Sequence, residues 1–391
     1  VSQTSRSNVH PAAAGLRHSR APSNLDTASF VNSRIASHTQ IRFRARVQLK
    51  FWRHDLQLAN AWAIAGGAAK LVQPVLFVRL ADAAGASGLG EAAPSRRYAE
   101  TVATAQNFFE RVDARQLSFA DLAGSMAYLD ALAPGEFSAK SALNIALLDG
   151  AAKRARQPLH QFLGLGFREQ THVTSFSIGL DEPREIGAKV LAAADFPILK
   201  LKVGSPRDRE NFAALRAVAP QKLVRVDANE AWCTKEIALE NLAWLAADGR
   251  VEFVEQPMPA DASAADLRWL KSRSPLPLFA DESFHVAADA ARCAEFFHGV
   301  NVKLAKTGGV TNAVAALRAA RAHGLQTMLG CMIESSALIS AAAQLAELAD
   351  HLDLDGNLLV TNDPFRGATA GGGIISFAAA PERAGIQVSA R

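Results

Sequence analysis

The chain has 391 residues, of which 49% are hydrophobic and 20% are charged, a composition typical of a globular protein. The formal net charge is +4, but residues 1–46 contain seven arginines and a single acid, Asp26, so the remainder is close to neutral and gives no support for a nucleic-acid-binding surface. Three cysteines without paired spacing argue against a disulfide scaffold or a structural zinc site. No apolar run approaches the roughly 20 residues of a membrane helix. We therefore expect a cytoplasmic protein with neither nucleic acid nor a membrane as partner.

Residues 1–40 lack hydrophobic periodicity and are rich in Ser, Ala and Arg. They contain no apolar core of the kind that secretory signals need, whereas the Arg and Ser bias leaves a transit peptide open. The composition predicts a disordered leader, which we exclude from the fold.

The first folded part of the chain is predicted to be α+β. Segments 41–52 and 74–94 are rich in β-forming residues and end in glycine turns, a pattern typical of antiparallel strands. Helical patterns follow. In residues 138–155 apolar side chains recur at spacings of three and four, and Ser138 or Ser141 is expected to cap this helix.

From about residue 173 the sequence pattern changes to short apolar runs, each followed by an Ala- and Leu-rich helical stretch. The runs cover residues 173–179, 197–204, 222–230, 251–257, 277–283, 299–309, 324–335 and 351–356. Strand–helix units that repeat about every 25 residues favour a parallel sheet, and eight of them predict a closed (β/α)8 barrel. An open doubly wound sheet is the alternative, but no GxGxxG turn follows any strand.

These patterns predict an α/β protein, a (β/α)8 barrel with an α+β capping domain. We assign residues 41–170 to the capping domain and residues 171–356 to the barrel. The Gly-rich residues 357–391 are expected to return to the capping domain.

Polar residues gather at the ends of the predicted barrel strands, where catalytic side chains project in such folds. Asp227, Glu255 and Asp281 end three consecutive strands. A single carboxylate at a strand end is usually a helix cap or a surface residue, but three on neighbouring strands would repel one another and could not all ionise. A divalent cation resolves this, and oxygen ligands without His or Cys favour Mg²⁺ over zinc.

Lysines flank this acidic group on both sides. Lys200 and Lys202 alternate along one strand and so share a face, while Lys303 ends a strand on the far wall of the barrel. A substrate carboxylate at the cation would present its α-carbon between Lys202 and Lys303, which suits removal of the α-proton and return of a proton to the opposite face. The base must be a neutral lysine, and we expect the neighbouring lysines and the cation to lower its pKa.

The motifs "LKLKVG", "VDANEAW", "EQPMP", "ADES" and "NVKLAKTGG", together with "GLGEAAPSRRYAET" in the capping domain, resemble those of the enolase superfamily, muconate-lactonizing subgroup. The resemblance runs from about residue 41 to the C-terminus. It implies that Asp227, Glu255 and Asp281 are the ligands of one Mg²⁺ per subunit. It also implies that Lys202 and Lys303 are the acid/base pair and that Lys200 assists at the substrate carboxylate.

Several reactions share this core, and the segment "LDLDG" discriminates between them. Asp353 and Asp355 alternate on the eighth strand, and such a pair resembles the Asp-x-Asp of dipeptide epimerases, where it suits the ammonium group of a dipeptide. The resemblance also implies that Ser175, Cys331 and Met332 touch substrate. We therefore expect an isomerase: a dipeptide epimerase that inverts the α-carbon of the C-terminal residue through an enediolate.

The loop expected to close over the substrate side chain, residues 60–70, departs from the family pattern. It contains no arginine to pair with a glutamate side chain; Lys70 is the nearest cation, and Trp62 suits an apolar pocket. The side chain of the second residue stays open between acidic, hydrophobic and cationic. A homo-oligomeric state is also open. The alternatives are an N-acylamino acid racemase or o-succinylbenzoate synthase of the same subgroup, and a small-molecule binding protein without activity.

Overall fold

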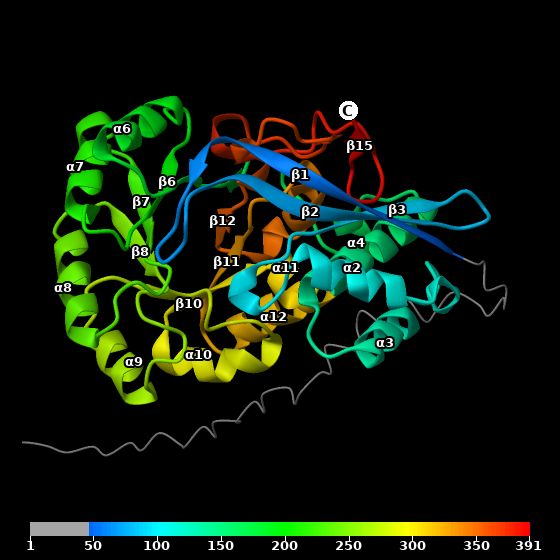
Figure 1. Cartoon of the computed structure of the whole chain (residues 1–391), viewed down its shortest axis with the longest axis horizontal. Coiled ribbons are helices and arrows are strands. Elements are labelled where there is room, and N and C mark those ends of the chain that lie inside the picture. Colours follow the sequence, from blue (N-terminus) through cyan, green and yellow to red (C-terminus); the bar gives the residue numbers. More distant parts are fainter. Residues whose placement is uncertain (1–46) are drawn as a thin grey trace, which may run out of the picture. The chain divides into compact units, whose positions relative to one another are not determined.

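The computed structural model describes residues 47–391 (Figure 1), so the leader expected over residues 1–40 lies outside the described residues. The described chain begins with a three-stranded antiparallel sheet of β1 (Gln48–Trp62), β2 (Lys70–Ala81) and β3 (Ser87–Ala92). Strand β1 extends ten residues beyond the predicted end at position 52. The reason is that Leu56 and Leu58, two residues apart, are both buried, so the alternation of a half-buried strand continues.

Helices follow this sheet. They are the short η1 (Arg96–Tyr98) and η2 (Ala114–Gln116) and the α-helices α2 (Val102–Arg111), α3 (Leu122–Leu132), α4 (Phe137–Arg154) and α5 (Leu159–Phe162). The cap predicted for α4 is wrong, because Ser138 and Ser141 lie inside the helix and are buried. Instead the Glu100 carboxylate accepts hydrogen bonds from the first backbone N–H groups, those of Phe137 (2.6 Å) and Ser138 (3.0 Å).

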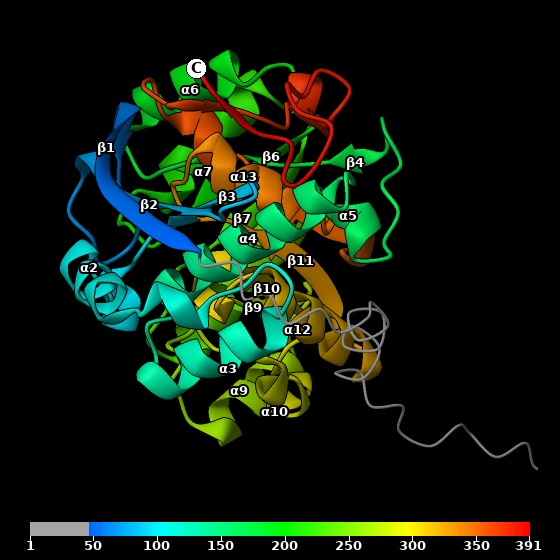
Figure 2. The same ribbon diagram turned by 90° about the vertical axis from the view of Figure 1, so that its right-hand side faces the viewer.

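Helix α4 packs directly on β3 (Figure 2). Two glycines permit the close approach. A Cβ atom at Gly88 would lie 1.8 Å from the carbonyl oxygen of Ala146, and one at Gly90 would lie 1.9 Å from that of Ala142. Any larger residue at either position would push the helix off the sheet.

The predicted barrel is confirmed. Its eight strands lie in the order β12-β11-β10-β9-β8-β7-β6-β5 and are parallel. The bounds are β5 (Phe176–Ile178), β6 (Ile198–Lys202), β7 (Leu223–Asp227), β8 (Val251–Glu255), β9 (Leu278–Ala280), β10 (Gly299–Lys303), β11 (Gln326–Gly330) and β12 (His351–Asp353). A parallel bridge between Thr174 and Leu352 joins the first and last strands, so the open-sheet alternative is wrong.

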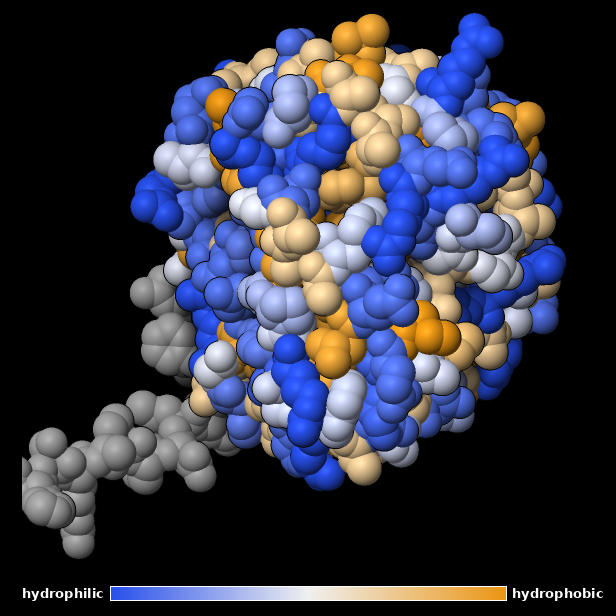
Figure 3. Space-filling view, turned by 90° about the vertical axis from the view of Figure 1, so that its left-hand side faces the viewer, coloured by the Kyte–Doolittle hydropathy of each residue, from blue (hydrophilic) through white to orange (hydrophobic). Residues whose placement is uncertain are grey.

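Helices cover the outside of the barrel (Figure 1). They are α6 (Pro183–Ala192), α7 (Asp208–Val218), α8 (Lys235–Ala246), α9 (Ala264–Lys271), α10 (Ala290–Phe296), α12 (Val310–Ala322) and α13 (Ser336–Ala343), with the short η3 (Ala287–Asp289) and η4 (Ala346–Leu348). The short, buried α11 (Leu304–Thr307) follows β10 directly and packs against α4. Within residues 47–391, no helix combines the length and apolarity that crossing a bilayer requires. On the face that carries α6, α7 and α8, apolar residues form small patches among hydrophilic ones (Figure 3).

The barrel interior is layered. Phe253 and Phe279 stack near its middle with ring centroids 4.0 Å apart and are buried. Because side chains of a strand alternate, the residues two positions further along β8 and β9 point into the same interior, one layer closer to the barrel mouth. Those residues are Glu255 and Asp281, so the layer that contains Phe253 and Phe279 lies directly beneath the acidic layer. Arg225 and His351 contact Phe253 in the same lower layer.

The C-terminal segment runs back over the N-terminal part. It contains β13 (Phe365–Arg366), β14 (Ile374–Ile375), β15 (Ser389–Ala390), η5 (Gly356–Leu359) and η6 (Gly371–Gly373), and β14 pairs with β4 (His172–Val173). Val360 forms a bridge with Leu58 of β1, and the backbone N–H of Ile386 donates to Asp149 of α4 (2.8 Å). The described residues form one compact unit, so the boundaries at 170 and 356 stay a prediction.

Glu91 of β3 connects the N-terminal sheet to the barrel. Its buried carboxylate accepts hydrogen bonds at the N-terminus of α13, from the backbone N–H groups of Ser335 (3.0 Å) and Leu338 (3.2 Å) and from the Ser335 hydroxyl (2.5 Å). Burial raises the pKa of Glu91 to about 7, although these hydrogen bonds oppose the rise.

We predict that Glu91→Gln flattens the pH dependence of stability. The folded protein holds a proton on Glu91 up to about pH 7, whereas the ordinary pKa is 4.5. The free energy of unfolding should therefore fall by about 3 kcal/mol for this group as the pH rises through that interval. Urea denaturation at several pH values should show a smaller fall in the free energy of unfolding for the variant than for the wild type. Equal falls would contradict the raised pKa of Glu91.

Candidate active site

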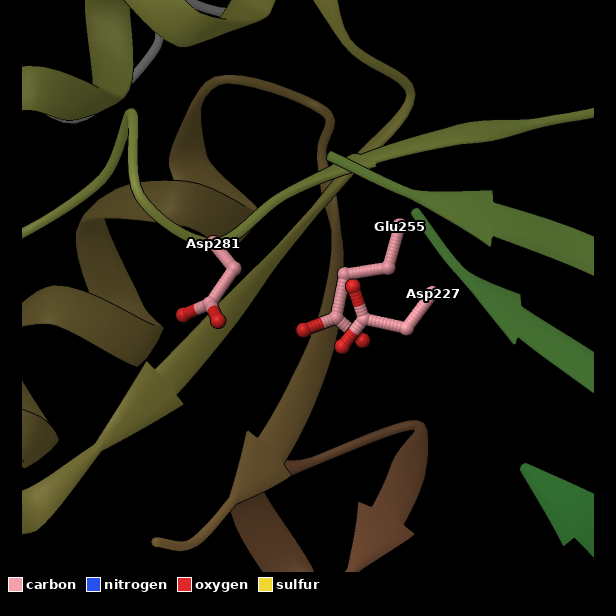
Figure 4. A group of neighbouring side chains, drawn as sticks. All are labelled: Asp227, Glu255 and Asp281. Atoms are coloured by element: carbon pink, nitrogen blue, oxygen red, sulfur yellow. The ribbon is translucent and has the colours of Figure 1, made fainter. Parts of the chain in front are cut away.

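Three carboxylates converge at the C-terminal end of the barrel strands. Asp227 ends β7, Glu255 ends β8 and Asp281 directly follows β9. Asp227 and Glu255 are register partners, so their side chains lie at the same level. One oxygen from each of the three lies within 4.8 Å of the others, and the exposed fractions are 0%, 0% and 1% (Figure 4).

The donor set fits a hard divalent cation. Burial and the neighbouring Asp227 carboxylate raise the pKa of Glu255 to about 7, which shows how unfavourable three adjacent buried anions are. Asn301 holds Glu255 in place by donating from Nδ2 to Oε1 (2.8 Å). Three oxygen ligands without nitrogen or sulfur are the chemistry that Mg²⁺ prefers.

The two lysines predicted as acid and base face each other across this group. Strand β6 with Lys202 and strand β10 with Lys303 are four places apart in a ring of eight strands, so they lie on opposite walls. Lys202 Nζ lies 2.5 Å from Asp227 Oδ2, and Lys303 Nζ lies 2.7 Å from Asp281 Oδ2. Both lysines are buried and both line the same cavity.

Lys200 joins the triad to the eighth strand. Its Nζ lies 2.7 Å from Glu255 Oε2, 2.7 Å from Asp353 Oδ2 and 3.2 Å from Asp227 Oδ2. Burial lowers the pKa of Lys200, but the three carboxylates outweigh it and the pKa rises well above the ordinary value. Carboxylates raise the pKa of Lys303 in the same way. The charge of Lys200 does lower the pKa of Lys303, but the Asp281 and Glu255 carboxylates outweigh it. The net lowering expected with the cation in place stays a prediction.

The two aspartates of the eighth strand differ. Asp353 accepts from Lys200 and from the Ser175 hydroxyl (2.7 Å); burial raises its pKa, but these partners lower it to about 2. For Asp355, burial and the charge of Asp353 raise the pKa to about 6, and its Oδ2 accepts from the Ser177 backbone N–H (2.5 Å). Lys200 thus already compensates Asp353. Among residues 47–391, no lysine forms such an ion pair with Asp355.

A cavity of about 950 Å³ lies above these groups, large enough for a small peptide. It is bounded by the barrel mouth, by the β1–β2 hairpin with Trp62 and Lys70, and by Cys331 and Met332 after β11. The hairpin reaches the barrel mouth, because the Leu180 backbone N–H donates to the Ala63 carbonyl oxygen (2.9 Å). Among the predicted substrate contacts in the described chain, Ser175 does not line the cavity; it is buried beneath Asp353.

Two family profiles match the chain. Residues 60–164 match the mandelate racemase/muconate lactonizing enzyme N-terminal domain, and residues 185–371 match the enolase C-terminal domain-like family. A relative from Pedosphaera parvula, an L-Ala-D/L-amino acid epimerase, is 58% identical over 88% of this chain and 100% of its own length. The chain belongs to the mandelate racemase/muconate lactonizing enzyme family of the enolase superfamily.

Two further members of the superfamily resemble the chain closely. The L-Ala-D/L-Glu epimerase of Bacteroides thetaiotaomicron is 36% identical over 85% of this chain and 86% of its own length. The crystal structure of a dipeptide epimerase from Cytophaga hutchinsonii, complexed with Mg and the dipeptide D-Ala-L-Val, is 29% identical. It superposes with a TM-score of 0.80 over 88% of this chain and 95% of that one.

Three further residues at this site were not predicted. Lys306 is buried and its Nζ donates to the Asp281 carboxylate (2.6 Å); its position three residues after Lys303 indicates that it lies near the same strand end. Arg97 donates to both carboxylate oxygens of Glu230 (2.5 and 2.6 Å), which joins the capping part to the loop after β7. That pair is 133 positions apart, and no local pattern reveals it.

Proposed function

We propose that the protein is a Mg²⁺-dependent dipeptide epimerase, an isomerase that inverts the α-carbon of the C-terminal residue of a dipeptide. The observation that carries the proposal is the opposed pair Lys202 and Lys303 above the acidic triad, with Asp355 beside them in the same cavity. The full-length likeness to an L-Ala-D/L-amino acid epimerase supports it.

The two lysines move the proton. In its neutral form, one of them takes the α-proton from one face of the carbon, and the other, as an ammonium, returns a proton to the opposite face. Because the two lysines lie on opposite walls, the same residues serve the forward and the reverse epimerisation. The lysine that acts as base in one direction acts as acid in the other. Mg²⁺ held by Asp227, Glu255 and Asp281 would offset the charge of these carboxylates and the charge that develops on the substrate carboxylate as it becomes an enediolate.

Lys200 connects the acidic triad to Asp353 at the base of the cavity. It is buried between Glu255 and Asp353, so it fixes the charge balance at the point where the substrate carboxylate would enter. Asp355 is placed to accept the ammonium group of a dipeptide, because it lines the cavity and no lysine of the described chain forms an ion pair with it. Asp353 pairs with Lys200 and so keeps this ammonium group away from the Asp355 carboxylate.

We predict that Asp355→Asn lowers kcat/KM for dipeptides by about 10²-fold, because a charge-assisted hydrogen bond to the substrate ammonium becomes a neutral one. The effect should fall mainly on KM, measured with L-Ala-L-Xaa dipeptides by polarimetry. An N-acylamino acid racemase or o-succinylbenzoate synthase has no ammonium group to hold, so in either case the substitution would change turnover of its own substrate little.

The second residue of the dipeptide lies toward the β1–β2 hairpin in this proposal. The wall there is mixed: Trp62, Ile64 and Val72 are apolar, whereas Lys70 is cationic and pairs with Gln73 (2.5 Å). This supports hydrophobic and acidic side chains as substrates over cationic ones. A cytoplasmic location and a homo-oligomeric state stay predictions.

A further inference from the structure

Gln256 occupies an unusual position directly after the metal ligand Glu255. Its side chain is buried, with an exposed fraction of 0%, and its amide makes four hydrogen bonds. Oε1 accepts from the backbone N–H groups of Asp281 (3.0 Å) and Ser283 (3.1 Å). Nε2 donates to the Met258 carbonyl oxygen (2.8 Å) and the Ser283 hydroxyl (2.9 Å). An amide has two acceptor sites and two donors, so its full capacity is used.

The backbone of Gln256 touches the two neighbouring strand ends as well. Its N–H donates to the Phe279 carbonyl oxygen on β9 (2.8 Å), and its carbonyl oxygen accepts from the Glu230 N–H in the loop after β7 (2.8 Å). One residue therefore bridges the segments that carry Asp227, Glu255 and Asp281.

The conformation of Gln256 has an energetic cost. Its φ is +36°, in the left-handed region that residues other than glycine seldom adopt. Such strain persists only where the surroundings impose it, and here four side-chain and two backbone hydrogen bonds do so. Glu255 points into the barrel interior as the last residue of β8, and the left-handed turn follows it. There the Gln256 amide reaches the backbone N–H groups of Asp281 and Ser283.

We infer that Gln256 is a positioning residue that fixes the separation of the metal ligands Glu255 and Asp281 and thereby sets the affinity for Mg²⁺. The inference rests on the metal site of the proposed function. The amide of Gln256 contacts neither carboxylate. It acts through the backbone position of Asp281, which it binds, and through Glu255, which precedes it in the chain.

A buried amide with all its hydrogen bonds satisfied also stabilises the fold, so the test needs a control for stability alone. Gln344 on the far side of the barrel provides one. It is equally buried, and its Oε1 accepts from the backbone N–H of His160 (3.0 Å) while lying 2.7 Å from the His160 ring nitrogen Nδ1. It contacts none of the three carboxylates.

The experiment compares Gln256→Met and Gln344→Met in the full chain, with Mg²⁺ affinity measured by isothermal titration calorimetry and unfolding measured without the metal. Both variants should be destabilised. Gln256→Met should raise the Kd for Mg²⁺ by about tenfold or more, as removal of an outer-sphere partner typically does, while Gln344→Met should leave it within about twofold.

An unchanged Kd in a folded Gln256→Met protein would overturn the inference while leaving the proposed function intact. Absence of Mg²⁺ binding by the wild type would instead overturn the metal site and the inference with it. If Gln256→Met does not fold, Ser283→Ala carries the test, because it removes one partner of the amide. It should raise the Kd by about threefold, and an unchanged Kd would again overturn the inference.

Discussion

Alanine at position 303 is expected to abolish epimerisation, and alanine at position 202 is expected to do the same. Each variant removes one of the two groups that take and return the α-proton, so the rate should fall on the order of 10³-fold or more. In D₂O each variant should still exchange the α-proton, but from one face of the carbon only. One variant should therefore exchange the α-proton of the L,L dipeptide, and the other variant that of its epimer. Proton NMR of the α-hydrogen measures both processes in the same sample.

Lys140 provides the matched control for these variants. It is a buried lysine on α4 that pairs with Asp130 (3.1 Å), outside the cavity. Lys140→Ala should lose stability but retain epimerisation in the fraction that folds. If both the Lys202 and Lys303 variants still epimerised, the two-base mechanism would be wrong.

Removal of the metal is expected to have an effect of similar size. Treatment with EDTA should eliminate turnover, and added Mg²⁺ should restore it, because the carboxylates that raise the pKa of Lys303 would otherwise keep the base protonated. Glu255→Gln should lower both turnover and the affinity for Mg²⁺, since it removes one of three ligands. The measurement is the rate as a function of Mg²⁺ concentration.

Glu240, exposed on α8, serves as the control for that substitution. Glu240→Gln removes the same charge outside the barrel and should leave the Mg²⁺ dependence unchanged. Full activity in EDTA, or an unaltered Mg²⁺ response of Glu255→Gln, would contradict the assignment of the triad.

The barrel and its acidic triad could be predicted because they follow from local patterns. A short apolar run followed by a helical pattern marks each strand, and a carboxylate at the end of three consecutive strands must meet its neighbours when the strands are parallel. The same logic placed Lys202 opposite Lys303. None of these inferences required knowledge of how distant segments pack.

The features that local patterns did not show depend on the packing of distant segments. The N-terminus of α4 is capped by Glu100 from a preceding loop, and not by its own serines. The Asp353 and Asp355 pair looked equivalent in sequence, but Lys200, which is 153 positions away from Asp353, neutralises only the first of them. Ser175 similarly faces Asp353 instead of the cavity. Each of these residues has a partner that the local sequence does not reveal.

The most direct test of the central claim is incubation of the full chain with Mg²⁺ and a library of L-Xaa-L-Xaa dipeptides in D₂O, read by mass spectrometry. We expect a mass increase of one deuterium in a subset of dipeptides, located at the α-carbon of the C-terminal residue and accompanied by its D epimer. Hydrophobic and acidic second residues should be enriched in that subset. A panel of N-acylamino acids is incubated under the same conditions. Deuterium in that panel, with none in any dipeptide, would contradict the assignment as a dipeptide epimerase.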